Sequence, residues 1–215
     1  MDFYDMFIIQ GDFMEYNEEK LKDILSNITE FNDIKLSDIP DIDLYMDQVT
    51  TLFDMKLKSL KRDDDDKIMT KTMVNNYAKT KFFPTVKGKK YNKEQIILLE
   101  VIYNLKQSLS LSDIETILTS TMENIHKEEK NFPPMEDLYG TFLDIKEIQL
   151  ENFCEDFNKL NNVIKEKSKK LQGEDDKLKE LILLIFTLIS KANMEKRMAE
   201  KLIDNFLKDN DKSVK

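Results

Sequence analysis

The stretch TKTMVNNYAKTKFFPTVKGKKY, residues 70–91, decides how this chain is expected to fold. Thr70 is a favourable N-cap, and the apolar residues that follow it at spacings of four predict a short helix over residues 70–80. The helix is expected to end before Pro84, because proline does not continue a helix. A single glycine among lysines then predicts a short basic hairpin, or wing, over residues 85–91.

One face of the predicted helix is polar along its whole length. Its members follow the spacing i, i+3, i+4 and i+7: Thr72, Asn75, Asn76 and Lys79. Asparagine is disfavoured in a helix interior by a few tenths of a kcal/mol. The two adjacent amides therefore indicate either a function or an exposed face without one.

Helices are expected on both sides of this stretch. Four glycines and four prolines in 215 residues argue against a hairpin-rich all-β fold. Asn92 with Gln95, and Ser110 with Asp113, are typical of the starts of two further helices. Apolar periodicity predicts the remaining helices over residues 18–34, 43–60, 141–171, 175–190 and 192–208. The expected fold class is all-α with a small β wing.

Charge is distributed unevenly along the chain. Residues 67–106 hold nine lysines against two glutamates, a net charge of +7, whereas the whole chain carries −9. The overall balance excludes a uniformly basic coat for nucleic acid. A basic segment inside an acidic chain favours local binding of a polyanion, which the remaining residues, at −16, repel. A chance excess of lysine is the competing interpretation.

The residue inventory argues against metal and nucleotide chemistry. Cys154 is the only cysteine and His126 the only histidine, so neither a zinc site nor a catalytic triad is expected. The glycines do not cluster into a phosphate-binding loop. The acidic runs at residues 63–66 and 174–176 match no calcium-binding spacing and predict solvated loops. We therefore expect no enzymatic activity, no cofactor and no metal.

A reducing cytoplasm is the expected compartment. One cysteine permits no intramolecular disulfide, and the first residues do not have the pattern of a signal peptide. Residues 1–17 mix aromatic and acidic residues without a clear period, which predicts a loosely docked arm. The longest apolar run, residues 181–189, is far short of the about 20 residues that cross a bilayer. It predicts a buried helix and no membrane contact.

Three short motifs carry a family resemblance. They are residues 70–77 (TKTMVNNY), residues 89–91 (KKY) and residues 105–107 (LKQ), and a serine-capped helix follows them. In this order they resemble the winged-helix DNA-binding domain of MerR-type transcription regulators. More closely, the chain resembles a bacterial family that is numbered 1836 among the domains of unknown function and is regarded as MerR-like. The resemblance covers about residues 36–122.

The resemblance implies a winged helix-turn-helix domain that binds double-stranded DNA. It places Asn75 and Asn76 where MerR regulators carry an arginine and an aromatic residue, and Lys89 where they carry the wing arginine. Lysine offers a point charge, whereas the arginine guanidinium can donate two parallel hydrogen bonds to one phosphate. Asparagine suits adenine and the threonine methyl suits thymine, so A·T-containing sites are expected. The expected DNA contacts are Lys71, Thr72, Asn75, Asn76, Tyr77, Lys79, Lys87, Lys89, Lys90 and Tyr91.

Three parts are expected along the chain. An arm and helix occupy residues 1–35, the helix-turn-helix domain occupies residues 36–126, and residues 135–208 form helices that dimerise or bind a partner. An apolar 3-4-3-4 repeat predicts a homodimer contact at Leu150, Phe153, Phe157, Leu160 and Ile164. The competing interpretation buries these residues inside a C-terminal bundle of the same chain.

Two functions are compatible with the sequence. The first is a DNA-binding transcription regulator, which the basic segment and the wing favour. The second is a protein-interaction or scaffold protein that keeps the winged-helix fold without binding DNA. The missing arginines and the acidic remainder favour the second function.

Overall fold

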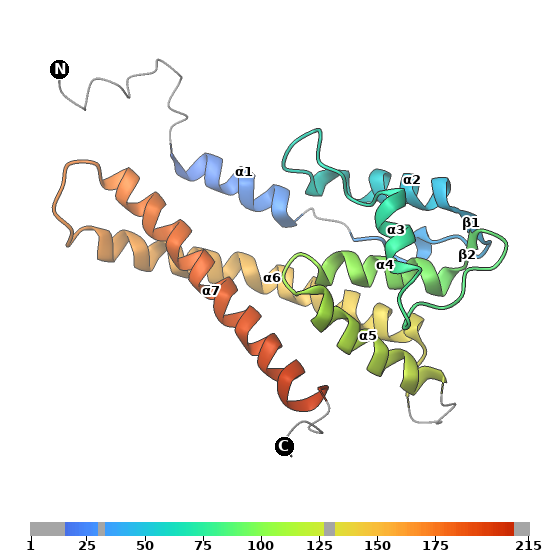
Figure 1. Ribbon diagram of the computed structural model, residues 1–215. Helices are drawn as coiled ribbons and strands as arrows, with labels where there is room; N and C mark the ends of the chain where they lie inside the picture. Colours follow the sequence, from blue (N-terminus) through green and yellow to red (C-terminus); the bar gives the residue numbers. More distant parts are fainter. Residues whose placement is uncertain (1–15, 30–32, 127–131, 209–215) are drawn as a thin grey trace, which may run out of the picture.

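The computed structural model describes residues 16–29, 33–126 and 132–208, and most of these residues are helical (Figure 1). In chain order the elements are α1 (Glu18–Thr29), the 3₁₀ turn η1 (Leu36–Asp38), β1 (Leu44–Tyr45), α2 (Met46–Lys56), the 3₁₀ turn η2 (Lys58–Leu60), α3 (Lys71–Tyr77), β2 (Lys90–Tyr91), α4 (Lys93–Leu105), α5 (Leu111–His126), α6 (Met135–Ser168) and α7 (Asp176–Phe206). A mostly helical fold with a small antiparallel sheet is confirmed. None of the described helices is long and apolar enough to cross a membrane.

α4 is the central helix of the hydrophobic core. Eight of its thirteen residues are buried, because apolar side chains occupy nearly every face of this helix. A helix that is apolar all round is stable only when other elements surround it. α2 contributes Val49 and Phe53 to this core, and α6 contributes Met135 and Tyr139. The first turns of α6 thus share one core with α2 and α4.

The predicted starts of α3 and α4 are confirmed by their caps. Thr70 Oγ1 accepts a hydrogen bond of 3.2 Å from Met73 N. At the start of α4, Asn92 and Gln95 each accept a hydrogen bond of 2.9 Å from the backbone N–H of the other. These bonds satisfy N–H groups that the first turn of a helix leaves unpaired, and so they fix where each helix begins.

The two-stranded sheet joins the segment before α2 to the predicted wing. Tyr45 of β1 lies opposite Lys90 of β2. A tight turn precedes β2, in which Lys90 N donates a hydrogen bond of 3.1 Å to Lys87 O. The two residues between them, Gly88 and Lys89, both have positive φ, 60° and 61°. Glycine adopts this conformation freely and lysine does so only at a cost, so the turn fixes Lys89 at the tip of the wing.

Several predicted helix boundaries are wrong. Residues 43–60 do not form one helix, because β1 takes the first positions and η2 follows α2. Residues 175–190 and 192–208 form the single helix α7, with no break at Ser190. No glycine or proline interrupts α7, and ending the helix would leave unpaired backbone groups, so the helix continues. α1 and α3 are shorter than predicted, and α6 begins before residue 141; residues 1–15 lie outside the described residues.

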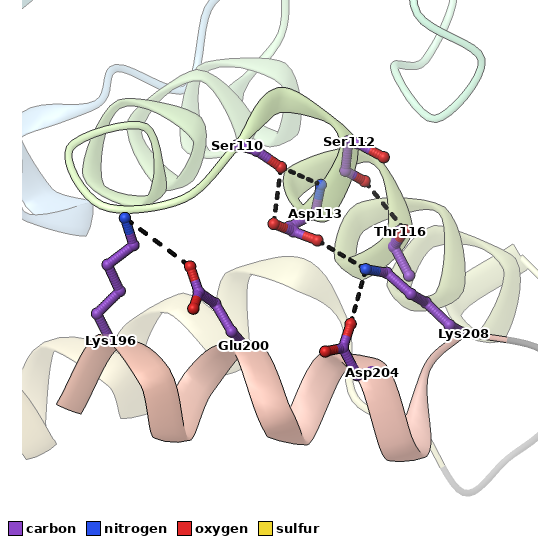
Figure 2. Close-up of polar contacts among 8 residues, drawn as sticks. All are labelled: Ser110, Ser112, Asp113, Thr116, Lys196, Glu200, Asp204 and Lys208. Carbon is purple, nitrogen blue, oxygen red and sulfur yellow. Dashed lines mark hydrogen bonds and ion pairs between the residues drawn. The ribbon is translucent and has the colours of Figure 1, made fainter. Parts of the chain in front are cut away.

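α6 connects the core to the C-terminal helices. Its first half packs on α4, and its second half contacts both α1 and α7 (Figure 1). The end of α7 returns to the start of α5, where Lys208 Nζ lies 3.0 Å from Asp113 Oδ1 and 2.8 Å from Asp204 Oδ1 (Figure 2). Ser110 Oγ donates a hydrogen bond of 2.7 Å to the same Asp113 carboxylate.

Candidate nucleic-acid interface

A hollow of about 850 Å³ lies between α3, the loop that follows it, and the wing at residues 85–91. We refer to it as the α3–wing hollow. It is lined by Tyr45, Met46, Asp47, Asn75, Ala78, Lys79, Thr80, Lys81, Phe83, Thr85, Val86, Lys89 and Tyr91. The fold therefore brings four of the ten expected DNA contacts to one concave surface: Asn75, Lys79, Lys89 and Tyr91.

The polar face of α3 points away from the core. Thr72, Asn75 and Asn76 of α3 are exposed, as is Lys79 two residues after its end, whereas Val74 on the other side of α3 is fully buried. This separation follows from the helical period, which places the apolar residues of α3 against α2. The four polar side chains are free to contact a ligand without disturbing the core.

Four lysines at the hollow and on the wing form no ion pair with the described residues. They are Lys79 and Lys81 at the end of α3, and Lys87 and Lys89 on the wing, and all four are exposed. A phosphate group can approach such lysines without displacing a carboxylate. This arrangement is electrostatically suited to an anion that spans both walls of the hollow.

Two other expected contacts, Lys71 and Lys90, already have partners. Lys71 forms an ion pair with Asp47, the acidic residue that lines the hollow. Both side chains are more than half exposed, so the pair contributes little stability and exchanges readily for a phosphate contact. Lys90 Nζ lies 5.0 Å from the centre of the Tyr45 ring, within the range of a cation–π interaction.

Two lysines of the basic segment are directed elsewhere. Lys93 Nζ lies 2.8 Å from Glu136 and 3.3 Å from Asp41, which ties α4 to α6 and to the segment before β1. Lys106 Nζ donates a hydrogen bond of 3.2 Å to Ile68 O, and burial lowers the pKa of this lysine. Both residues serve the fold, so the charge at the hollow is smaller than the sequence count suggests.

The two tyrosines among the expected contacts are largely packed into the protein. Tyr91 is only 3% exposed, and Tyr77 is half-buried. Burial raises the pKa of both phenols, which therefore stay neutral. Neither ring is available for stacking on a base.

Tyr45 and Lys81 line the hollow but are missing from the expected contacts. Lys81 could have been found, since it lies in the basic segment between the helix and the wing. Tyr45 could not, because the apolar periodicity of residues 43–60 predicts one helix and the pairing of β1 with β2 is not visible in a local pattern. Tyr45 is 54% exposed beside the wing.

The five residues expected to form a homodimer contact lie along the second half of α6. Ile164 is buried and the other four are half-buried. Phe153 lines a hollow together with Leu188 of α7, and Phe157 lines another together with residues of α1. Neighbouring helices of the same chain therefore cover part of this surface.

The sequence pattern of one protein family matches residues 34–142, a little more than half of the chain. This family is described as a domain of unknown function (DUF1836). The chain belongs to this family. No curated protein and no solved structure gives a significant match.

The family's span contains the complete α3–wing hollow. It begins at Ile34 and ends at Phe142, so it also includes the core helices and the first two turns of α6. α1, the rest of α6 and α7 lie outside the matched residues. The candidate interface thus lies within the matched residues of this chain, and the C-terminal helices do not line it.

Proposed function

We propose that this protein is a transcription regulator that binds double-stranded DNA through α3 and the wing. The α3–wing hollow is the observation that carries the proposal. One exposed amide, that of Asn75, and three exposed lysines without ion pairs among the described residues, Lys79, Lys81 and Lys89, line one concave surface. The chain order of α2, α3 and the wing is also that of a winged helix-turn-helix domain, which supports the MerR-like interpretation.

In this proposal α3 reads bases in the major groove. Its exposed face offers two adjacent amides, Asn75 and Asn76, and amides suit the N6 and N7 atoms of adenine. Thr72 adds a methyl group that suits thymine. Lys71 and Lys79 stand at the two ends of this face and are placed to contact phosphates. We therefore propose a preference for A·T-containing sites.

The wing has a separate role, which is contact with the DNA backbone. Lys87 and Lys89 are exposed without ion pairs, and the positive φ of Lys89 holds its side chain at the tip of the turn. Lysines at such a tip neutralise phosphates without reading sequence. The acidic remainder of the chain repels DNA, so it favours the orientation in which only α3 and the wing approach.

A salt titration tests DNA binding. The full chain is titrated against a fluorescently labelled mixed-sequence duplex, and the anisotropy is followed from 25 to 300 mM KCl. We expect log Kd to rise linearly with log salt, with a slope of about 0.9 for each phosphate contacted. Absence of binding at 25 mM KCl, or binding that does not respond to salt, contradicts the proposal.

We also propose that the DNA-binding form is a homodimer. A helix-turn-helix protein gains affinity and half-site specificity when two copies bind a two-fold symmetric site. The half-buried residues Leu150, Phe153, Phe157 and Leu160 of α6 are the proposed contact. Light scattering at high micromolar concentration tests this, and a monomer there contradicts it.

A second candidate function is supported by the C-terminal helices. Ile145 and Ile148 of α6 and Met198 and Phe206 of α7 are each more than half exposed. Exposed apolar side chains of this number are typical of a surface that binds another protein. If the duplex titration shows no binding, an interaction or scaffold function that retains the fold becomes the better account.

A further inference from the structure

The outer face of α7 is an exposed apolar surface, so the prediction of a buried helix over residues 181–189 is wrong for this face. It consists of Leu178, Ile182, Ile185, Phe186 and Ile189, which are between 40% and 67% exposed. Their spacing places them on one side of the helix, in a stripe about 17 Å long. Leu184, on another side of α7, is buried. A continuous apolar stripe of this length is typical of a surface that another segment covers.

α5 covers the continuation of this face toward the C-terminus. Figure 2 shows Lys196, Glu200 and Asp204 on the side of α7 that is turned toward α5. Ile189 and Ile182 stand seven and fourteen residues before Lys196, which places them on that same side of the helix. The outer face therefore begins where the cover by α5 stops.

We propose that residues 3–9 of this chain, with the sequence FYDMFII, pack on the outer face of α7. Six of these seven residues are apolar, and the remaining one is Asp5. Apolar residues of this density gain free energy when they leave water together with a second apolar surface. The outer face is one of several exposed apolar surfaces, and residues 3–9 are the most apolar part of the chain outside the described residues.

The first described residues lie close enough for this contact. Glu18, two residues after Tyr16, forms an ion pair of 2.5 Å with Lys165, which holds this end of the described chain beside α6. Burial and the charge of Glu180 of α7 raise the pKa of Tyr16 while Lys165 lowers it, which agrees with this position. Phe7 stands nine positions before Tyr16, and an extended chain of that length spans roughly 30 Å. A helix with its side chains is about 10–12 Å across. Residues 3–9 can therefore pass around α7 and reach its outer face.

Charge favours one direction for the segment. Residues 1–15 contain four acidic residues and no lysine or arginine. Glu180, whose charge acts on Tyr16, lies in the second turn of α7, and the exposed Arg197 stands beyond the other end of the apolar stripe. Lys196 beside it is paired with Glu200. A segment that runs from Tyr16 toward Arg197 places Asp5 and Asp2 nearest to its positive charge, where the attraction is strongest.

Disulfide trapping in the full chain tests the proposal. Cys154 is first replaced by serine, and Phe7→Cys is then combined with Ile185→Cys. The matched control combines Phe7→Cys with Met194→Cys, because Met194 is 63% exposed on a different side of the same helix. Each protein is oxidised at low micromolar concentration, and the products are identified by mass spectrometry.

We expect an intramolecular disulfide between positions 7 and 185 that forms at least tenfold faster than the control disulfide. Equal rates for the two pairs overturn the proposal, because they indicate a segment without a preferred face. Products that link two chains also overturn it, because a second copy then covers the outer face.

Discussion

The hydroxyl of Tyr139 donates a hydrogen bond of 2.7 Å to the backbone carbonyl of Ile34, across 105 positions of the chain. Both residues are buried, with exposed fractions of 1% and 0%. The two stand close to the two ends of the family's span, residues 34–142. This bond links the first residue of the matched span to α6. The first turns of α6 are therefore part of the structure of the family domain.

Tyr139→Phe is expected to destabilise the protein by about 1–3 kcal/mol, because the Ile34 carbonyl then stays buried without a donor. Urea unfolding followed by circular dichroism measures the change. Tyr45→Phe is the matched control. Tyr45 is exposed, so removing its hydroxyl leaves no buried group without a partner and should change the stability little. Equal stabilities of the two variants contradict a structural role for the bond.

Glu100 makes the stability of the core depend on pH. Its carboxyl is fully buried, Oε1 accepts a hydrogen bond of 3.0 Å from Asn104 Nδ2, and Oε2 has no partner among the described residues. Burial, helped by the charge of Asp33, raises its pKa from 4.5 to about 7. The folded chain thus holds this proton more tightly than the unfolded chain. The resulting stability is complete below pH 4.5 and is lost as the pH rises through about 7.

Glu100→Gln is expected to remove this dependence, because glutamine keeps the acceptor for Asn104 and carries no charge. The stability of the variant relative to the wild type should rise by about 2–3 kcal/mol between pH 5 and pH 8. Urea unfolding at several pH values in one buffer system measures the difference. A difference that stays constant with pH contradicts the assigned pKa.

Local chemistry explains which parts of the fold are predictable from the sequence. The start of α4 is predictable because Asn92 and Gln95 satisfy each other's backbone within one turn. The polar face of α3 is predictable because a helical period separates Asn75 from Val74. The continuity of α7 is not predictable in this way. Serine is common at helix ends, so Ser190 favours a break, but packing against the neighbouring helices keeps α7 continuous.

The α3–wing hollow is only partly predictable, because its walls come from segments that are far apart in the chain. The lysines of the wing could be identified from composition. The pairing of Tyr45 with Lys90, and that of Asp47 with Lys71, depend on how β1 and α2 pack. No pattern within a single helix or strand contains such a relationship.

Asp47→Asn is expected to strengthen DNA binding about two- to fivefold at 100 mM salt. The substitution removes a negative charge from the hollow and frees Lys71, and exposed charge pairs of this kind are worth up to about 1 kcal/mol. Anisotropy titration measures the affinity. Asp54→Asn carries the same charge change on an exposed residue of α2 that lies outside the hollow, and it should have a smaller effect. Equal effects of the two substitutions contradict a position of DNA in the hollow.

Asn75→Ala combined with Asn76→Ala is expected to reduce sequence selectivity and to leave non-specific binding nearly intact. Each good base contact is worth about 1–3 kcal/mol of discrimination. Sequences selected from a random duplex pool by the wild type and by the variant give the measurement. Asn158→Ala with Asn162→Ala on α6 is the control. If the asparagine variant selects the same A·T-containing sites as the wild type, α3 does not read bases through these amides.

The most direct test of DNA binding through the wing compares the salt dependence of two double variants. Lys89→Ala with Lys90→Ala removes two wing lysines, and Lys169→Ala with Lys170→Ala removes the same charge at the far end of α6, where both lysines are exposed. We expect the wing variant to lower the slope of log Kd against log salt by about 1–2 relative to the wild type, and the α6 variant to leave it unchanged. Identical slopes for both variants and the wild type would contradict DNA binding at the α3–wing hollow.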